Sequence, residues 1–273
     1  MIGAIVGDIV GSKYEWVCFK SKDFEFLDPD KCSFTDDSVM TIAVALALAD
    51  WKKNGGDLPT LAVKRIRELG RRYPYAGYGG RFDQWLFSAD PQPYNSYGNG
   101  AAMRVSACGW AANSIEEAVA LSDAVTAVTH NHPEGLKGAA AVAVCVYLAR
   151  TGTPKDEIRR YVEENYYKID FTLDEIRPTY EFDPSCQGTV PQALAAFFES
   201  VSFEDAIRNA VSIGCDSDTI AAIAGGVAGA YYGVPDDIRH MTMYYLDTFL
   251  EKAFLHAERQ LKGKGTHRRS ANG

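Results

Sequence analysis

The 273-residue sequence predicts an all-α protein that forms a single domain. Three observations support this prediction. Apolar segments with helical spacing follow one another along the chain, the alternation typical of β-strands is scarce, and no flexible linker or repeat of roughly 20–50 residues divides the sequence. Hydrophobic residues make up 47% and charged residues 23% of the chain, which is ordinary for a globular protein with a sizeable core.

The first predicted helix carries Gly3, Gly7 and Gly11, which recur at every fourth residue. On a helix they form a stripe without side chains, against which a second helix can pack closely. A phosphate-binding loop is the alternative, but neither G-x-G-x-x-G nor G-x-x-x-x-G-K-[ST] is present. Asp8 and Glu15 are seven residues apart and are expected to share a helical face. Asp8 fits a buried structural acid, and Glu15 fits either a surface residue or a site carboxylate.

The remaining predicted helices are recognised by apolar spacing between start and stop signals. In chain order they cover residues 38–51, 61–69, 115–129, 134–150, 203–213, 218–232 and 235–262. Ser114 and Glu117 predict a capping box at the third of these helices. The last is expected to be one long helix with Pro235 near its first turn. We expect the longest loops at roughly 73–99 and 168–190, where these signals are missing.

Charge and composition exclude several classes of partner. The net charge of −8 and the sequence pI of about 5.2 argue against a nucleic-acid groove, which needs a basic face. No run of about 18 apolar residues is present, so no membrane span is expected. Basic residues lie among Gly, Ser and Asn after position 262, which predicts a domain of residues 1–262 followed by a flexible basic tail at 263–273.

The N-terminus and the cysteines indicate a cytoplasmic protein. The apolar first residues lack a basic segment and are interrupted by Asp8, which argues against a signal peptide. The six cysteines are scattered without a CxxC spacing, so reduced thiols are the simplest interpretation. They are Cys18, Cys32, Cys108, Cys145, Cys186 and Cys215.

Two short acidic motifs each stand immediately before a predicted helix. The first runs from Phe34 to Ser38 (FTDDS), and the second from Gly214 to Thr219 (GCDSDT). Capping of the helix start is one explanation, since Asp, Thr and Ser accept hydrogen bonds from free N–H groups there. Two acids and a threonine in each motif exceed what capping requires. Crowded, partly buried carboxylates repel one another, and a bound cation relieves that repulsion. Oxygen ligands of this kind suit Mg²⁺, Mn²⁺ or Ca²⁺ rather than Zn²⁺.

Two further segments carry candidate binding groups. Residues 95–100 (NSYGNG) form a loop with two glycines and small donors, which is either a tight turn or a backbone cradle for an anion. His130 and His132 stand between two predicted helices. This pair does not predict a zinc site, because no cysteine or further histidine stands at ligand spacing. A histidine at a helix end more often has a structural role.

Taken together, these motifs resemble the ADP-ribosylglycohydrolases. The resemblance rests on residues 7–11 (GDIVG) with Glu15, the FTDDS motif, residues 98–104 (GNGAAMR), Thr129-His130 and residues 216–220 (DSDTI). They occur in the order of that family and span residues 1 to about 235. Each motif alone is weak, whereas the combination is specific. The resemblance implies a single compact, orthogonal helical domain that holds two magnesium ions, with manganese as an alternative.

The resemblance also implies roles for individual residues. Metal ligands are expected at Thr35, Asp36, Asp37, Asp216, Asp218 and Thr219. Glu15 corresponds to an acid beside the metals and the scissile bond, and Met103 and Arg104 are expected to be structural supports. The substrate-binding residues are expected to be Ser96, Tyr97, Gly98, Asn99 and Gly100, around the diphosphate and proximal ribose, and His130. Cys215 and Ser217 depart modestly from the family pattern, and neither removes a ligand.

The implied activity is magnesium-dependent hydrolysis of the N- or O-glycosidic bond that links ADP-ribose to a protein side chain or small acceptor. Cleavage of such a bond passes through an oxocarbenium-like state, and Glu15, Asp216 and Asp218 are the expected catalytic acids. A phosphohydrolase acting on a nucleotide diphosphate and a catalytically silent ADP-ribose-binding or structural protein are the alternatives. The identity of the acceptor depends on loops that differ widely among such proteins.

Overall fold

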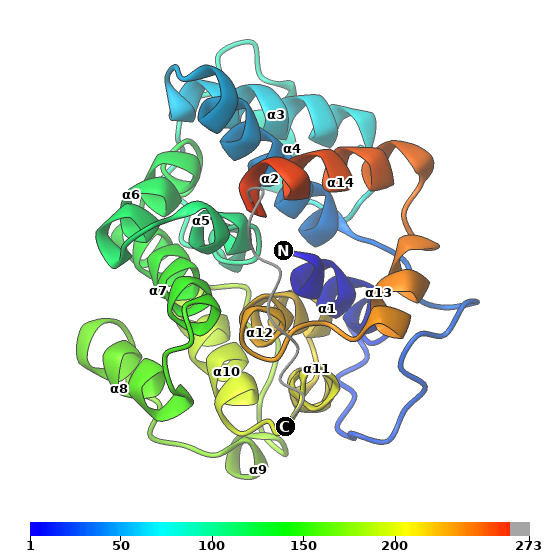
Figure 1. The fold of residues 1–273 in the computed structure, drawn as a ribbon. Coiled ribbons are helices and arrows are strands. Elements are labelled where there is room, and N and C mark those ends of the chain that lie inside the picture. Colours follow the sequence, from blue (N-terminus) through cyan, green and yellow to red (C-terminus); the bar gives the residue numbers. More distant parts are fainter. Residues whose placement is uncertain (263–273) are drawn as a thin grey trace.

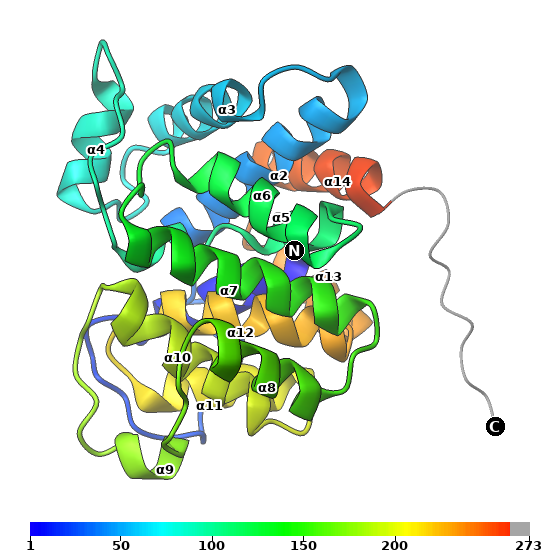
Figure 2. The same cartoon turned by 90° about the vertical axis from the view of Figure 1, so that its left-hand side faces the viewer.

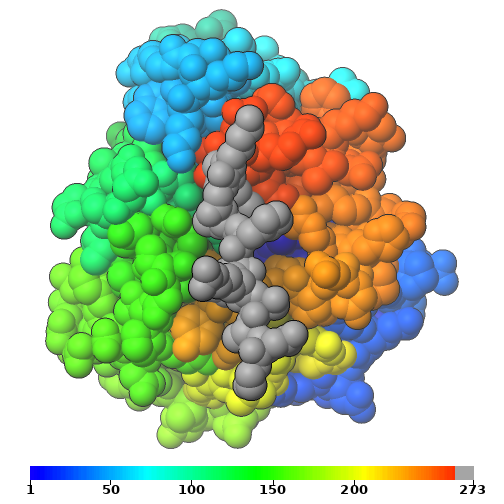
Figure 3. All heavy atoms as spheres, viewed as in Figure 1, coloured from blue at the N-terminus to red at the C-terminus, as the bar shows by residue number. Residues whose placement is uncertain are grey.

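The computed structural model describes residues 1–262, and within them the chain is all-α, with no β-strand. Two helices lie at the centre of the molecule: α1 (Ile2–Ser12) and α12 (Ser217–Tyr231) (Figure 1). Nearly every residue of both helices is buried, which fits their small and apolar sequences. In the space-filling view only a small dark-blue part of the chain start is visible among the residues around it (Figure 3). The fold class predicted from the sequence is therefore confirmed.

The glycine stripe of α1 packs closely against another helix, as predicted, and the structure shows that this helix is α12. A Cβ atom on Gly7 would lie 1.9 Å from the carbonyl oxygen of Ala221. Gly3 and Gly11 are packed almost as closely, at 2.1 and 2.4 Å from carbonyl oxygens of α12. Backbone therefore meets backbone along the whole length of α1, and a side chain at any of the three positions would force the helices apart.

The other helices surround this central pair (Figures 1 and 2). In chain order they are α2 (Asp36–Asn54), α3 (Leu58–Arg72), α4 (Gly80–Phe87), the 3₁₀ helix η1 (Asn99–Ala101), α5 (Ser106–Ala111), α6 (Ile115–Thr126), α7 (Pro133–Arg150), α8 (Lys155–Asn165), α9 (Leu173–Ile176), α10 (Cys186–Phe198), α11 (Phe203–Ile213), α13 (Asp236–Met243) and α14 (Thr248–Lys262). None of the described helices is long and apolar enough to cross a membrane. The predicted tail at 263–273 lies outside the described residues, so the domain boundary at 262 stays a prediction.

Most predicted helices are confirmed, with their ends shifted by a few residues. Gly55 ends α2 and Ser114 caps α6, where its side chain accepts a hydrogen bond from the Glu117 backbone N–H. In a capping box the Glu117 carboxylate would accept a hydrogen bond from the Ser114 backbone N–H. Here it accepts from the Asn113 backbone N–H instead. Helices α4, α5, α8, α9 and α10 were not predicted; α4, α9 and the start of α10 lie in segments predicted as loops.

The prediction of one final helix over residues 235–262 is wrong. The chain breaks between α13 and α14 at residues 244–247. Asp247 is the physical reason, since its side chain accepts hydrogen bonds from the backbone N–H groups of Phe249 and Leu250, each at 2.9 Å. An aspartate in that position starts a new helix rather than continuing the old one.

The prediction of six reduced cysteines is also wrong for two of them. Cys18 and Cys215 form a disulfide across 197 residues of sequence, with their Cα atoms 4.0 Å apart. Cys32, Cys108, Cys145 and Cys186 are free and buried. Sequence spacing gave no sign of the pair, because folding alone brings residue 18 beside residue 215.

Candidate metal centre and binding pocket

Both acidic motifs lie at the start of a helix in the middle of the molecule. Thr35 is the N-cap of α2, and its hydroxyl accepts a hydrogen bond from the Asp37 N–H at 3.3 Å. Asp216 is the N-cap residue of α12, but its side chain makes no capping hydrogen bond. Capping therefore accounts for Thr35 and leaves the carboxylates of Asp36, Asp216 and Asp218 without that explanation.

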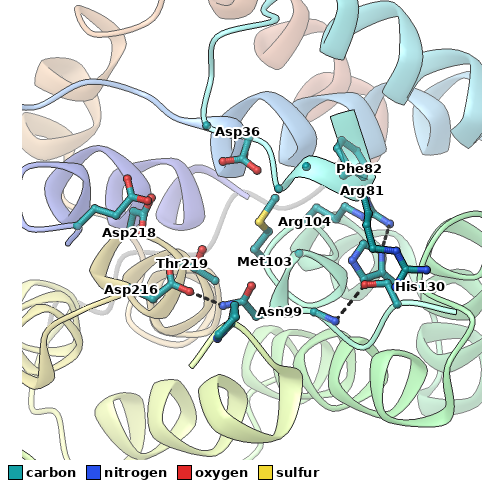
Figure 4. Close-up of a pocket in the computed structure, with 18 of the residues that line it drawn as sticks. Asp36, Arg81, Phe82, Asn99, Met103, Arg104, His130, Asp216, Asp218 and Thr219 are labelled. Carbon is teal, nitrogen blue, oxygen red and sulfur yellow. Dashed lines mark hydrogen bonds between the residues drawn. The ribbon is translucent and has the colours of Figure 1, made fainter. Parts of the chain in front are cut away.

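The two motifs contact each other directly. The Thr219 hydroxyl donates to Asp37 Oδ2 at 3.0 Å, across 182 residues of sequence. Asp8, Asp37 and Asp218 each offer a carboxylate oxygen within 4.8 Å of the others, and all three residues are buried. Asp36 and Asp216 line the same pocket beside this group (Figure 4). The structure thus brings together all six residues that the sequence predicted as metal ligands.

Asp8 has a role that the sequence did not reveal. Its carboxylate accepts hydrogen bonds from the Thr35 N–H and hydroxyl, at 3.0 and 2.6 Å, and from the Ser38 N–H and hydroxyl. It therefore anchors the first acidic motif from the middle of α1. The expectation that Asp8 and Glu15 share a helical face is wrong, because α1 ends at Ser12 and Glu15 lies in the turn after it. Glu15 still reaches the carboxyl of Asp218.

Two carboxylate oxygens of the cluster are buried without a hydrogen-bond partner: Asp37 Oδ1 and Asp218 Oδ1. None of the ion pairs among the described residues involves a carboxylate of the cluster. A buried, ionised and unpaired oxygen is costly, and an oxygen-ligated cation would satisfy both atoms at once. The donor set therefore fits a hard divalent metal ion.

Burial and mutual repulsion raise the pKa values of these acids. Burial is the larger cause for Asp36, whose pKa is raised to about 8, and the nearby charges of Asp8 and Glu15 add to it. Burial raises the pKa values of Asp37 and Asp218 well above the usual range, followed by the charge of Asp218 in the first case and of Asp216 in the second. The pKa of half-buried Glu15 is raised for the same reasons.

We expect the metal-free protein to lose stability as pH rises from 7 to 8.5. Over this range the folded state holds protons on Asp36 and its neighbours that the unfolded state has already lost, so the free energy of unfolding falls with pH. The range starts at pH 7 because the lowered pKa of His130 contributes an opposite slope below about 6.5. Thermal melts in a chelator test this, and Mg²⁺ should raise the melting temperature more at pH 8.5 than at pH 7. A melting temperature that rises over this range without metal would contradict the assignment.

The acidic cluster forms one end of a pocket with a cavity volume of about 350 Å³, the size of a small-molecule site. Asp36, Asp216 and Asp218 lie at one end, and the groups at the other end are basic or aromatic (Figure 4). The residues labelled at that other end are Arg81, Phe82, Arg104 and His130, and the Tyr94 ring lies against Arg81 and His130. The two ends of the pocket therefore differ in charge. The acidic end suits a metal ion, and the cationic end suits an anion.

The cationic end was only partly visible in the sequence. Arg104 is fully buried, and burial lowers its pKa to about 10, so it stays charged at neutral pH. Its Nη2 donates to the Thr129 hydroxyl at 2.6 Å, while its Nε has no partner. Met103 and Arg104 both line the pocket, whereas the family resemblance led us to expect structural supports at these positions. Burial lowers the pKa of His130 well below 6.5, which makes the imidazole neutral.

Arg81 and Tyr94 were not predicted at all. The Arg81 guanidinium lies over the Tyr94 ring, 4.9 Å from its centroid, and donates to the Tyr94 carbonyl oxygen. Both residues come from the segment predicted as a long loop. The one sequence signal was the glycine-rich stretch at Gly77, Gly79 and Gly80, since all three glycines line the pocket.

Only part of the loop predicted to bind the diphosphate lies in the pocket. Ser96, Gly98, Asn99 and Gly100 line the pocket. Asn99 Nδ2 donates to Asp216 Oδ2 at 2.6 Å, which connects this loop to the second acidic motif. Tyr97 is not part of the lining, because its half-exposed ring packs on His132, with centroids 5.1 Å apart. His132 itself caps α7, in keeping with a structural role.

Comparison with known proteins gives consistent matches over nearly the whole chain. The family model for ADP-ribosylglycohydrolase matches residues 1–264. ADP-ribosylhydrolase ARH3 of Homo sapiens is 28% identical over 94% of this chain and 91% of its own length. ADP-ribosylarginine hydrolase Tri1 of Pseudomonas putida is 28% identical over 86% of this chain and 70% of its own. A solved ADP-ribosylglycohydrolase-related protein complex has the same fold, with a TM-score of 0.70, 24% identity and coverage of 96% and 94% of the two chains.

Proposed function

The chain belongs to the ADP-ribosylglycohydrolase family, and from this premise we propose that it is a magnesium-dependent hydrolase of the glycosidic bond between ADP-ribose and its acceptor. Acceptors include a protein side chain joined through nitrogen or oxygen, and a small molecule joined in the same way. The observation that carries the proposal is the pair of buried, unpartnered oxygens, Asp37 Oδ1 and Asp218 Oδ1. Asp218 lines one end of a pocket that has cations at its other end, and Asp37 lies beside Asp218. The opposite charges of the two ends match a ribose held beside a metal ion and a diphosphate held beside arginine.

We assign the metal to the two acidic motifs. Thr35, Asp36 and Asp37 from the start of α2, and Asp216, Asp218 and Thr219 from the start of α12, would hold two magnesium ions. When bound, magnesium would supply Lewis-acid polarisation of oxygen ligands and would offset the charge of the crowded carboxylates. The N-terminal ends of both helices favour the negative charge of these ligands.

The rest of the pocket would bind and orient the ADP-ribose. Arg81 and Arg104 give the far end of the pocket a positive potential that suits the diphosphate. Ser96, Gly98, Asn99 and Gly100 would hold the diphosphate and proximal ribose, and neutral His130 would line the groove beside them. Tyr97 stays a prediction as a binding residue. Binding energy from these remote parts would position the distal ribose against the acids.

The chemical step joins a water oxygen to C1 of the distal ribose and breaks the bond from C1 to the acceptor, which leaves with a proton. Glu15 lies beside Asp216 and Asp218, and its raised pKa lets its carboxyl hold a proton that a solvated glutamate would have lost. We therefore propose Glu15, Asp216 and Asp218 as the acids that move protons between the water and the leaving group. The oxocarbenium-like state carries positive charge, which these carboxylates stabilise.

Incubation with a panel of ADP-ribosyl conjugates tests the activity. The panel contains arginine, serine, nucleic-acid base and O-acetyl conjugates, each with Mg²⁺ and with a chelator. Release of intact ADP-ribose that depends on Mg²⁺ supports the proposal. AMP with ribose phosphate would indicate a phosphohydrolase, and binding without any product would indicate a silent protein.

ADP-ribose with Mg²⁺ is expected to raise the melting temperature, and AMP at the same concentration should raise it less. A ligand at about 100 times its Kd stabilises the folded state by about 2.7 kcal/mol, which corresponds to roughly 5–10 °C for a chain of this size. AMP lacks the second phosphate. It also lacks the distal ribose, which the acidic end would hold. Thermal melts in both ligands measure the difference, and an equal shift from AMP would contradict the placement of the distal ribose.

A further inference from the structure

We propose that the Cys18–Cys215 disulfide is a positioning element that holds Glu15 against the acidic cluster, so that turnover depends on the oxidation state of this cysteine pair. The inference rests on the proposed function, because it assigns Glu15 to the reacting end of the pocket. Cys18 stands three residues after Glu15, and Cys215 immediately precedes Asp216. The disulfide therefore joins the segment of one proposed catalytic acid to the segment of another.

The segment that carries Glu15 is not held by a helix. It begins after α1 ends at Ser12, and its Trp16 and Cys18 have positive φ values of 66° and 47°. Cys215, on the other side of the disulfide, has a φ of 67°. Residues other than glycine rarely adopt this conformation, and they keep it only where the surrounding structure imposes it. The position of Glu15 thus depends on what the turn is attached to.

Contacts of the turn converge on the region around Cys215. The Trp16 backbone N–H donates to the Cys215 carbonyl oxygen at 3.2 Å. A Cβ atom on Gly214 would lie 2.7 Å from the Phe19 carbonyl oxygen, so the two backbones touch at that point. Lys20 Nζ donates to the carbonyl oxygens of Tyr180 and Ile213, at 2.7 and 2.6 Å.

Trp16 connects this attachment to the carboxyl itself. Its side chain lies within hydrogen-bonding reach of Glu15, and its ring stacks on Phe182 with centroids 4.7 Å apart. Trp16 is 71% exposed, so burial contributes little to holding it in place. The disulfide is the one covalent connection between this turn and the second acidic motif.

A dithiol reagent can break this connection in a balanced reaction. One thiolate of the reagent attacks a sulfur of the pair, and Cys18 is the accessible one because it is exposed while Cys215 is fully buried. The Cys215 sulfur leaves and takes a proton from water. The second thiol of the reagent then displaces Cys18 and forms a cyclic disulfide, so two electrons pass from the reagent to the protein.

A disulfide can also act only by stabilising the fold, because it restricts the unfolded chain. That role predicts a lower melting temperature after reduction, with kcat unchanged at temperatures where the protein stays folded. A positioning role predicts a loss of kcat in folded protein, while ADP-ribose, bound largely by the remote end of the pocket, keeps its affinity. Comparing the change in kcat with the change in the Kd for ADP-ribose therefore separates a positioning role from a purely stabilising one.

The experiment uses the wild-type chain before and after reduction with dithiothreitol, with the conjugate that the panel identifies as substrate. Alkylation under denaturing conditions should label the four free cysteines before reduction and all six of the chain after it. Reduction should lower kcat about tenfold or more, up to the loss seen in Glu15→Gln, because a displaced carboxyl no longer assists proton transfer. The Kd for ADP-ribose should change less than twofold, and glutathione disulfide should restore kcat.

Three variants complete the test. The Cys18→Ala/Cys215→Ala double variant should have the low kcat of the reduced protein and should not respond to dithiothreitol. Cys145→Ala removes a buried free thiol of α7 and should keep the full response. Trp16→Phe keeps a ring that can stack on Phe182 but loses the indole N–H. It should lower kcat while the disulfide stays intact.

Two results would overturn the proposal where a conjugate is hydrolysed. One is alkylation of all six cysteines before any reductant is added. The other is an unchanged kcat after complete reduction while Glu15→Gln lowers it, which would leave the proposed function standing. If no conjugate is hydrolysed, the proposed function fails instead, and hydrogen exchange at the Trp16 and Val17 amides decides the positioning role: faster exchange after reduction supports it, and unchanged exchange overturns it.

Discussion

Asp218→Asn is expected to lower the rate of hydrolysis by about 100-fold or more and to weaken Mg²⁺ binding. The substitution keeps the size of the side chain but removes one negative charge from the acidic cluster, where Asp218 Oδ1 is buried without a partner. Without metal, the variant should melt at the same temperature as the wild type or higher. The reason is that burial and the neighbouring acids already raise the pKa of this carboxyl, so its ionised form opposes folding.

Asp57→Asn is the matched control. Asp57 is a true helix cap, since its carboxylate accepts from the Thr60 N–H at 3.0 Å and from the Thr60 hydroxyl at 2.6 Å. It starts α3 after the C-terminal end of α2, whereas Asp36 and Asp37 lie at the N-terminal end of α2. Asparagine caps about as well as aspartate, so this variant should keep its stability, its Mg²⁺ affinity and its turnover. Calorimetric Mg²⁺ titration, initial rates and thermal melts of both variants give the comparison. Full activity in Asp218→Asn would remove Asp218 from the site.

Gly7→Ala is expected to have the largest effect on stability, a loss of about 3 kcal/mol, or roughly 6–12 °C in melting temperature. Its Cβ atom would lie 1.9 Å from the Ala221 carbonyl oxygen, and both colliding groups belong to helix backbones at the centre of the fold. Neither helix can move without disturbing the acidic cluster, because Asp8 follows Gly7 and Asp218 lies on α12. We therefore expect weaker Mg²⁺ binding as well.

Gly80→Ala provides the control for this prediction. Gly80 is the first residue of α4, and an added Cβ atom there has no neighbour within 4 Å. Alanine has the higher helix propensity, so stability should stay the same or rise slightly. Chemical denaturation of the two variants measures the difference. Equal stability of Gly7→Ala and the wild type would mean that α1 and α12 are not in backbone contact.

Local features of this protein could be predicted from the sequence because they depend on residues close together in the chain. The stripe of Gly3, Gly7 and Gly11 needs only the period of a helix to be visible. The two acidic motifs are recognisable because each precedes a helix that is apolar enough to reach the core. The family resemblance then placed both motifs in one metal site, and their spatial proximity in the structure agrees with it.

Contacts between residues from distant parts of the chain were decided by the tertiary structure alone. Asp8 anchors the first acidic motif because the fold brings the middle of α1 against the start of α2. The residues around Asp8 in the sequence indicated only a buried acid. Arg81 and Tyr94 line the pocket because α4 carries Arg81 and the chain after α4 brings Tyr94 under its guanidinium. The sequence of residues 73–99 showed no helical pattern from which this could be predicted. Tyr97 turns towards His132 and away from the pocket that its loop neighbours line.

The disulfide shows the same limit most clearly. A covalent bond between residues 18 and 215, which are 197 positions apart in the sequence, depends on two Cα atoms lying 4.0 Å apart in the fold, and scattered cysteines do not reveal such a distance. The sequence by itself determined α1, α2, α3, α6, α7, α11 and α12, the glycine stripe of α1 and the residue types of the site. The tertiary structure decided which of these residues meet, because distances across the fold are set by the packing of whole helices and not by the spacing of residues along one of them.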